Sequence, residues 1–117
     1  MSRDFRLFLD DIRTACGRIE EFTTGMDATA FAADPKTISA VERQLFIIGE
    51  AVKQLPPDVR SRFAEVEWRE VSGFRDVLAH GSWKIDPETL WTTARQDVPM
   101  LLGQIERILE VVGALGT

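Results

Sequence analysis

An arginine and a histidine five residues apart, Arg75 and His80, are the side chains of this 117-residue sequence best suited to phosphate chemistry. His80 is the sole histidine, and an imidazole can accept or donate a proton near neutral pH. A guanidinium beside it could hold a phosphate and stabilise a developing phosphorane. Together they suit cleavage of RNA, whose own 2′-hydroxyl would supply the nucleophile. The same mechanism would leave DNA intact.

A structural interpretation of the same pair stays open. An arginine and a histidine near a helix end more often form a salt bridge and cap the helix dipole. The helix predicted for residues 67–80 places Arg75 inside an apolar arc, where a charge must meet an acid of another helix or face a cleft that receives an anion. Glu50 is a candidate acid. The apolar arc comprises Trp68, Val71, Phe74, Leu78 and Ala79.

Residues around the pair complete a candidate site. Asp76 lies four residues before His80, so on a helix its carboxylate could orient the imidazole ring. Arg75 is about 140° from His80 at 100° per residue, so it would have to extend along the helix to meet it. Trp83 and Lys84 could stack a base and contact a phosphate, although such a tryptophan more often packs over a helix end.

Composition limits the classes of function. The formal net charge of −5 argues against a broad basic face for nucleic acid, and residues 60–84 are the only plausible anion-facing region. The single cysteine, Cys16, is expected to fill the core, because it has no second cysteine or nearby histidine at metal-ligand spacing. We expect neither a metal nor another cofactor. No apolar run approaches the ~20 residues of a membrane span, and the first residues lack a signal-peptide pattern, so a cytoplasmic protein is expected.

Hydrophobic periodicity predicts helices throughout. Apolar residues at helical spacing indicate helices over residues 4–24, 35–55, 57–63, 67–80 and from 86 onward. Asp34 and Asp86, each followed by a proline, mark two helix starts, and Pro99 must kink or interrupt the last helix. The sequence therefore predicts one all-α domain over 1–117, a four- to five-helix up-and-down bundle. A mixed face with Phe46 and Ile47 indicates a further contact, such as a second copy.

The segment WREVSGFRDVLAHGSWKID resembles the HepT-like (DUF86) branch of the HEPN superfamily, whose signature is an arginine, a polar residue, three more residues and a histidine. Arg75, Asp76 and His80 fit it. RIEEFTTGMD, AVERQLFIIGEAVKQLP and DVPMLLGQIERIL also resemble that family, so the likeness covers nearly the whole chain. It implies a helical homodimer that cuts RNA without metal at an interfacial cleft, with Arg75 and His80 catalytic. Arg43 and Glu50 are further candidates for this cleft.

The resemblance also implies a regulatory partner. Such proteins are usually toxins, and a minimal nucleotidyltransferase antitoxin can neutralise them by attaching nucleotide to a tyrosine two residues after the histidine. Here that position is Ser82, and the chain has no tyrosine. Ser82 could accept nucleotide instead, or the antitoxin could act by binding alone. A third alternative is that the toxin is losing its activity. A non-catalytic module that binds RNA, nucleotide or the nucleotidyltransferase stays open, as does a purely structural dimer.

Overall fold

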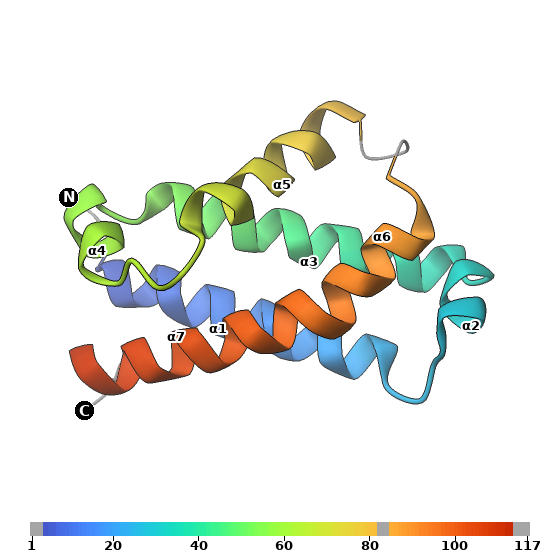
Figure 1. Cartoon of the computed structure of the whole chain (residues 1–117), viewed down its shortest axis with the longest axis horizontal. Helices are drawn as coiled ribbons and strands as arrows, with labels where there is room; N and C mark the ends of the chain where they lie inside the picture. The colour runs from blue at the N-terminus through green and yellow to red at the C-terminus, as the bar shows by residue number, and fades with distance from the viewer. Residues whose placement is uncertain (1–3, 82–84, 114–117) are drawn as a thin grey trace.

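The computed structural model describes residues 4–81 and 85–113, and these are helical apart from short turns and connections (Figure 1). They contain no strand, which confirms the all-helical class. Four long helical segments form a bundle, and two short helices cover its ends. The long segments are α1 (Phe5–Thr23), α3 (Pro35–Gln54), α5 (Trp68–Gly81) and α6 (Pro87–Thr92) with its continuation α7 (Val98–Val112); the short helices are α2 (Ala28–Ala32) and α4 (Pro57–Arg62).

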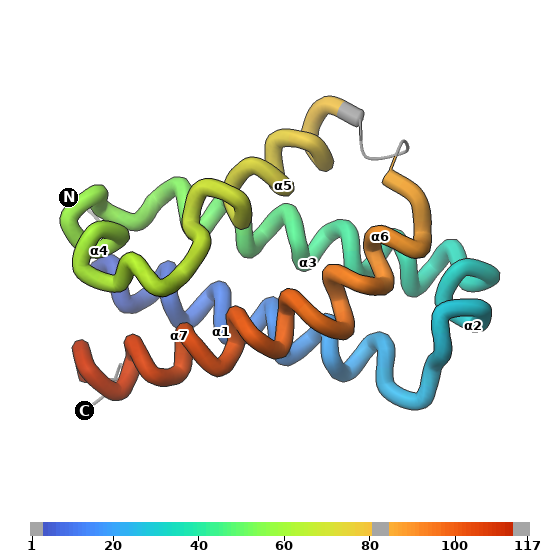
Figure 2. Tube along the Cα trace, in the orientation of Figure 1, coloured from blue at the N-terminus to red at the C-terminus, as the bar shows by residue number. Residues whose placement is uncertain are grey.

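Consecutive long segments run in opposite directions, as the bundle prediction requires. The tube in Figure 2 shows α1 and α5 running one way, and α3 and the α6–α7 segment running the other. Both ends of the described chain consequently lie at the end of the bundle occupied by α4 (Figure 1). The C-terminal end of α5 lies toward the opposite end.

Side-chain caps fix the predicted helix starts. Asp34 accepts a hydrogen bond from the backbone N–H of Thr37 at 3.2 Å, and Asp86 accepts one from Thr89 at 2.8 Å. Such caps satisfy N–H groups that have no partner within the helix. Hydrogen bonds to Thr37 and Thr89 lower the pKa values of the two aspartates. Gly25, with φ of +77°, lies just past α1, where glycine adopts the left-handed conformation at no steric cost.

The predicted interruption at Pro99 takes the form of a π-helical turn. Residues Thr93–Asp97 form this turn between α6 and α7, and Pro99 lies in the first turn of α7. A proline has no N–H and its ring clashes with the carbonyl four residues earlier. One wider turn absorbs that clash and lets the segment continue without a break.

The core lies where α1 and α3 pack together and α1 packs against α7. It is apolar and includes Cys16, which is fully buried as predicted, and burial raises the pKa of its thiol to about 12. Ala79, expected in the apolar arc of α5, is instead exposed, because the end of α5 rises away from α3 (Figure 1). Within residues 4–81 and 85–113, no helix has both the length and the apolar character needed to cross a membrane.

Candidate functional site

The candidate site begins where α5 crosses α3 at a glycine. A Cβ atom placed on Gly49 would lie 2.1 Å from the Cβ of Arg75 and 3.2 Å from its Cα. Real Cβ atoms do not approach this closely, so the absence of a side chain at Gly49 lets the two helix backbones come together. The crossing thereby places the base of the Arg75 side chain directly on α3.

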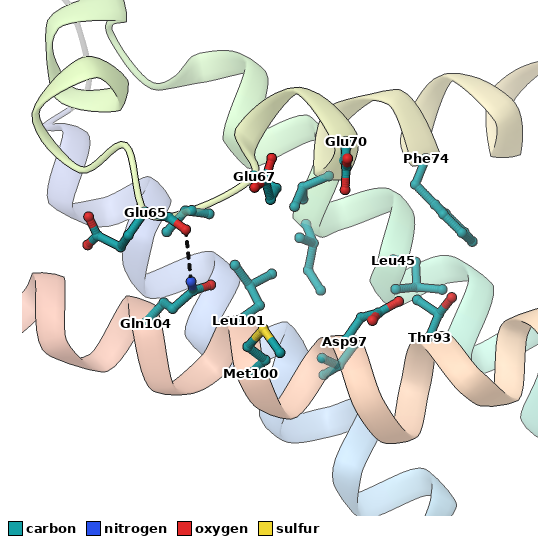
Figure 3. A pocket seen from close by; sticks show the side chains of 14 residues that line it. Leu45, Glu65, Glu67, Glu70, Phe74, Thr93, Asp97, Met100, Leu101 and Gln104 are labelled. Carbon is teal, nitrogen blue, oxygen red and sulfur yellow. Dashed lines mark hydrogen bonds between the residues drawn. The ribbon is translucent and has the colours of Figure 1, made fainter.

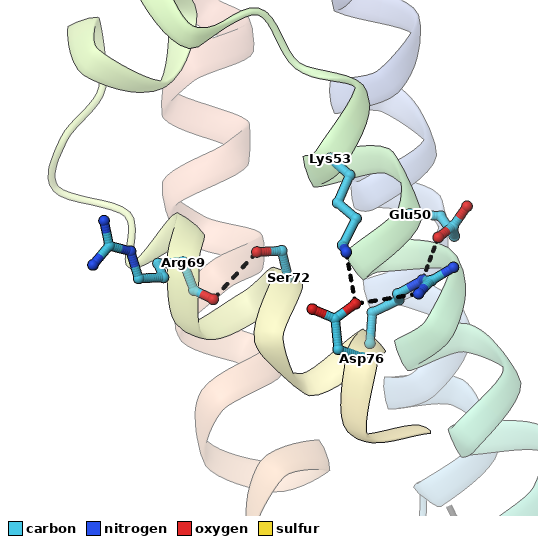
Figure 4. Close-up of polar contacts among 6 residues, drawn as sticks. Glu50, Lys53, Arg69, Ser72 and Asp76 are labelled. Carbon is cyan, nitrogen blue, oxygen red and sulfur yellow. Dashed lines mark hydrogen bonds and ion pairs between the residues drawn. The ribbon is translucent and has the colours of Figure 1, made fainter. Parts of the chain in front are cut away.

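The guanidinium of Arg75 is held by groups from both helices (Figure 4). Its Nε donates a hydrogen bond to Glu50 of α3, and its Nη1 donates one of 3.2 Å to Asp76. Lys53 of α3 donates a hydrogen bond of 2.6 Å to the same Asp76 oxygen. Of the two alternatives expected for Arg75, an acid of another helix or a cleft that receives an anion, the structure shows the first, and Glu50 is that acid.

Charge pairing fixes the protonation of this network. The Glu50 carboxylate raises the pKa of Arg75 above its ordinary value, with a smaller contribution from Asp76. The ammonium of Lys53, followed by Arg75, lowers the pKa of Asp76 below its ordinary value. Both shifts favour the charged forms. The pairs are partly exposed, with 23% of the Arg75 side chain accessible to solvent.

An aromatic ring and a groove adjoin the guanidinium. The Arg75 guanidinium carbon lies 5.0 Å from the centre of the Phe46 ring, and that of Arg43 lies 5.8 Å from it. Such cation–π contacts hold guanidinium groups in place without neutralising them. Arg43, Phe46 and Glu50 also line a groove of about 330 Å³ between α1 and α3. The groove is further lined by Phe8, Asp11, Ile47, Ala51 and Gln54.

His80 is separate from this network. It lies in the last turn of α5 and is exposed. The expected contact between Asp76 and His80 is not formed: the Asp76 hydrogen bonds found among the described residues go to Lys53 and Arg75. Arg75 likewise extends to α3 rather than along α5. Lys53 on the facing helix α3 explains why Asp76 turns away from His80. A pattern within one helix cannot reveal such a contact.

The expectations for Ser82, Trp83 and Lys84 fall outside the described residues. Among the residues that the structure describes, no three His, Cys, Asp or Glu side chains are grouped as metal ligands.

Comparisons with known proteins assign the chain to a family. The family model described as Ribonuclease HepT-like matches residues 12–108. The chain belongs to the HepT-like ribonuclease family. A Thermococcus cleftensis protein named "Probable ribonuclease HepT" is 41% identical over 108 residues, which cover 92% of this chain and 98% of that protein. No solved structure is significantly similar to the chain.

Two further relatives are named as candidate RNases. One, from Methanocaldococcus jannaschii, is 36% identical over 92% of this chain and 93% of its own length. The other, from Caldanaerobacter subterraneus, is 35% identical over 90% of this chain and 94% of its own length. The HepT-like match spans the whole of α3 and α5, so it includes Glu50, Arg75 and His80.

Two residues of the site were missed by sequence reasoning. Gly49 gave no signal, because a glycine within an amphipathic helix does not tell which helix will approach it. Lys53 lies three residues after Glu50, on the same face of α3, and this spacing could have indicated it. Phe46 was predicted to lie on a mixed face, but its contacts with two guanidinium groups were not foreseen.

Proposed function

We propose that the protein is a metal-independent endoribonuclease, the toxin of a toxin–antitoxin pair, that cuts RNA at a cleft shared by two copies. Membership of the HepT-like family, with relatives named as ribonucleases, supports RNA as the substrate. The observation that carries the mechanism is the Arg75 guanidinium, charged, partly exposed and held between α3 and α5. His80 lies five residues further along α5 and is exposed.

The reaction needs two proton transfers, one from the attacking 2′-hydroxyl and one to the departing 5′-oxygen. An imidazole of His80 removes the proton of the 2′-hydroxyl, and the 2′-oxygen forms a bond to the adjacent phosphorus. Arg75 stabilises the negative charge that gathers on the phosphoryl oxygens. The bond from phosphorus to the 5′-oxygen breaks, and an imidazolium, of the same or the second copy's histidine, protonates that oxygen. The products are a 2′,3′-cyclic phosphate and a 5′-hydroxyl.

A second copy would complete the site. Within one chain, Arg75 is directed toward α3, whereas His80 lies at the exposed end of α5. In a two-fold dimer each motif can face its counterpart, so an arginine of one copy and a histidine of the other can act on the same phosphate. The half-buried apolar side chains of Phe46 and Ile47, beside the groove of α1 and α3, supply a surface for this contact.

RNA cleavage in excess chelator tests the proposal. We expect the wild type to cleave total RNA and leave cyclic phosphate ends, and His80→Ala to lose activity by at least about a hundredfold, the usual contribution of a general acid or base. Glu110→Ala, an exposed change on α7, is the control and should cleave as the wild type does. Equal cleavage by His80→Ala and the wild type would refute the mechanism, and cleavage that needs added metal would refute its metal independence.

The same two proteins, expressed in a bacterial host, test the toxin role. Growth should stop with the wild type and continue with His80→Ala, and co-expression of the cognate minimal nucleotidyltransferase should restore growth. Mass spectrometry of the neutralised protein then tests Ser82: added nucleotide on Ser82 would show modification, and an unmodified protein would show neutralisation by binding.

One observation favours the alternative of a module that binds RNA, nucleotide or a nucleotidyltransferase without cleavage. Both Nε and Nη1 of Arg75 are already hydrogen-bonded to carboxylates, which leaves fewer donors for a transition state. Tight RNA binding without any cleavage product would select this alternative.

A further inference from the structure

A second groove lies on the other side of the motif helix, between α5 and the α6–α7 segment (Figure 3). Its volume is about 400 Å³. Its apolar lining comes from three helices, with Leu45 and Ile48 on α3, Phe74 on α5 and Leu101 on α7. Because Arg75 and His80 do not line it, it is distinct from the candidate catalytic site.

The rim of this groove is acidic. Glu67 and Glu70 approach it from the start of α5 and the residue before it, and Asp97 approaches from the π-helical turn opposite, whereas Glu65 meets it through its backbone carbonyl and turns its carboxylate away (Figure 3). All four side chains are exposed. In the described part of the chain none of them forms an ion pair, and no lysine, arginine or histidine lines the groove.

A hydrogen bond fixes one end of the groove, and a flexible side chain lies at its edge. Gln104 of α7 donates a hydrogen bond of 3.0 Å to the backbone carbonyl of Glu65, which ties the loop before α5 to α7. Met100, which is 67% exposed, lies at the edge. The flexible thioether of a methionine packs readily against varied apolar surfaces.

The charge of the rim selects among possible occupants. The unpaired carboxylates of Glu67, Glu70 and Asp97 repel the phosphates of RNA and of an anionic membrane. A second copy that met this groove by a two-fold axis would set the same carboxylates against one another. A helix with an apolar stripe and flanking lysines or arginines would bury the apolar floor and pair with the rim.

We propose that this acid-rimmed groove docks a basic amphipathic helix of a partner protein. The partner's apolar side chains enter between α5 and α7, and its cations contact the carboxylates of Glu67, Glu70 and Asp97. The docking does not depend on RNA cleavage, so a negative result for one proposal would leave the other unaffected.

A synthetic helical peptide, with leucines spaced three and four residues apart and lysines on both sides, is the probe. Fluorescence anisotropy of the labelled peptide is measured against the intact protein near physiological salt, about 0.15 M, where loose charge attraction is screened. We expect saturable binding that a peptide of the same composition in scrambled order does not show. Absence of binding, or equal binding of the scrambled peptide, would overturn the proposal.

Matched charge variants locate the binding. Glu67→Gln/Glu70→Gln removes two rim carboxylates, and Glu106→Gln/Glu110→Gln removes two exposed carboxylates elsewhere on α7. The rim variant should weaken binding about tenfold, which corresponds to about 1.4 kcal/mol, and the α7 variant should stay within about twofold of the wild type. An equal loss in both would show general attraction to an acidic protein and would refute the groove.

Two further measurements distinguish the other occupants. Addition of the peptide should shift the backbone amide NMR signals of residues 65–74 and 97–104. Shifts confined to residues 8–11 and 50–54, which line the groove of α1 and α3 instead, would contradict the proposal. The mass of the rim variant in solution should equal that of the wild type. A change in oligomeric state would instead assign the groove to a second copy of this chain.

Discussion

At the scale of single residues, Arg75 is a side chain with both structural and chemical roles. Its guanidinium bonds to Glu50 and Asp76 and lies 5.0 Å from the Phe46 ring centre. A partly buried charge held in this way is tolerated because its neighbours satisfy it. The same neighbours fix its orientation, which a group that stabilises a transition state requires.

The substitution Arg75→Lys separates the two roles. Lysine keeps the charge but cannot reproduce the forked hydrogen bonds to Glu50 and Asp76. If Arg75 acts on substrate, kcat for RNA cleavage should fall by about a hundredfold, measured well below the melting temperature, where the variant is folded. Circular dichroism gives that temperature. If activity falls only in step with the folded fraction, Arg75 would be a structural residue alone.

Asp76 makes stability depend on pH. Its pKa is lowered in the folded protein, chiefly by Lys53, so its contribution is present above the unfolded pKa of about 4. That contribution disappears as the pH falls through the lower folded value. At pH 7, Asp76→Asn should therefore melt below the wild type, and the gap should close toward pH 3.

Thermal unfolding across this pH range measures the effect. The control is Asp97→Asn, which changes an exposed aspartate that forms no ion pair with the described residues; its gap should be small and should change little with pH. A gap for Asp76→Asn that widens in acid would contradict the pairing with Lys53.

Sequence reasoning predicted Arg75, His80 and Glu50 as site residues but misjudged the contacts of Asp76 and Arg75. Spacing along α5 predicted that Asp76 would contact His80, because residues four apart are neighbours on a helix. In the folded protein Lys53 competes for that carboxylate from α3, at 2.6 Å. Contacts between helices depend on axial register and rotation, which the pattern of one helix does not contain.

At the scale of elements, the crossing of α3 and α5 controls the position of the motif. Helix starts were predictable, since Asp34 and Asp86 with their following prolines are local signals. The pairing of α5 with α3 was predictable only indirectly, because Arg75 was expected to meet an acid of another helix and Glu50 was a candidate. The close approach at Gly49 could not be predicted, because it depends on which helix lies opposite.

Gly49→Ala tests this crossing. The added methyl group would lie 2.1 Å from the Cβ of Arg75, so α5 must shift. We expect a loss of about 1–3 kcal/mol in the free energy of unfolding, typical of overpacking, together with reduced RNA cleavage. Chemical denaturation and the cleavage assay measure the two effects.

Gly73→Ala is the matched control, because it lies on the motif helix itself. A Cβ there meets nothing within 4 Å, so alanine should stabilise the helix by up to about 1 kcal/mol. Cleavage by this variant should be unchanged. Equal behaviour of the two variants would show that the crossing at Gly49 tolerates a side chain.

At the scale of the whole molecule, the proposed activity depends on two copies. Sedimentation should give twice the 13.2 kDa mass of one chain. Ile47→Lys, which places a charge on the half-buried mixed face of α3, should yield monomers that no longer cleave RNA. Val111→Lys changes a 62% exposed residue on α7 and should stay dimeric and active. A wild type that is monomeric yet active would refute the shared cleft.

The arrangement of the chain ends has a practical consequence. Both ends of the described chain lie at the end of the bundle that α4 occupies, and the end of α5 that carries His80 lies toward the opposite end (Figure 1). We therefore expect an affinity tag or fluorescent label joined to the chain before residue 4 or after residue 113 to leave the motif uncovered. Molecules immobilised by either end on a sensor surface would present the His80 end to RNA in solution.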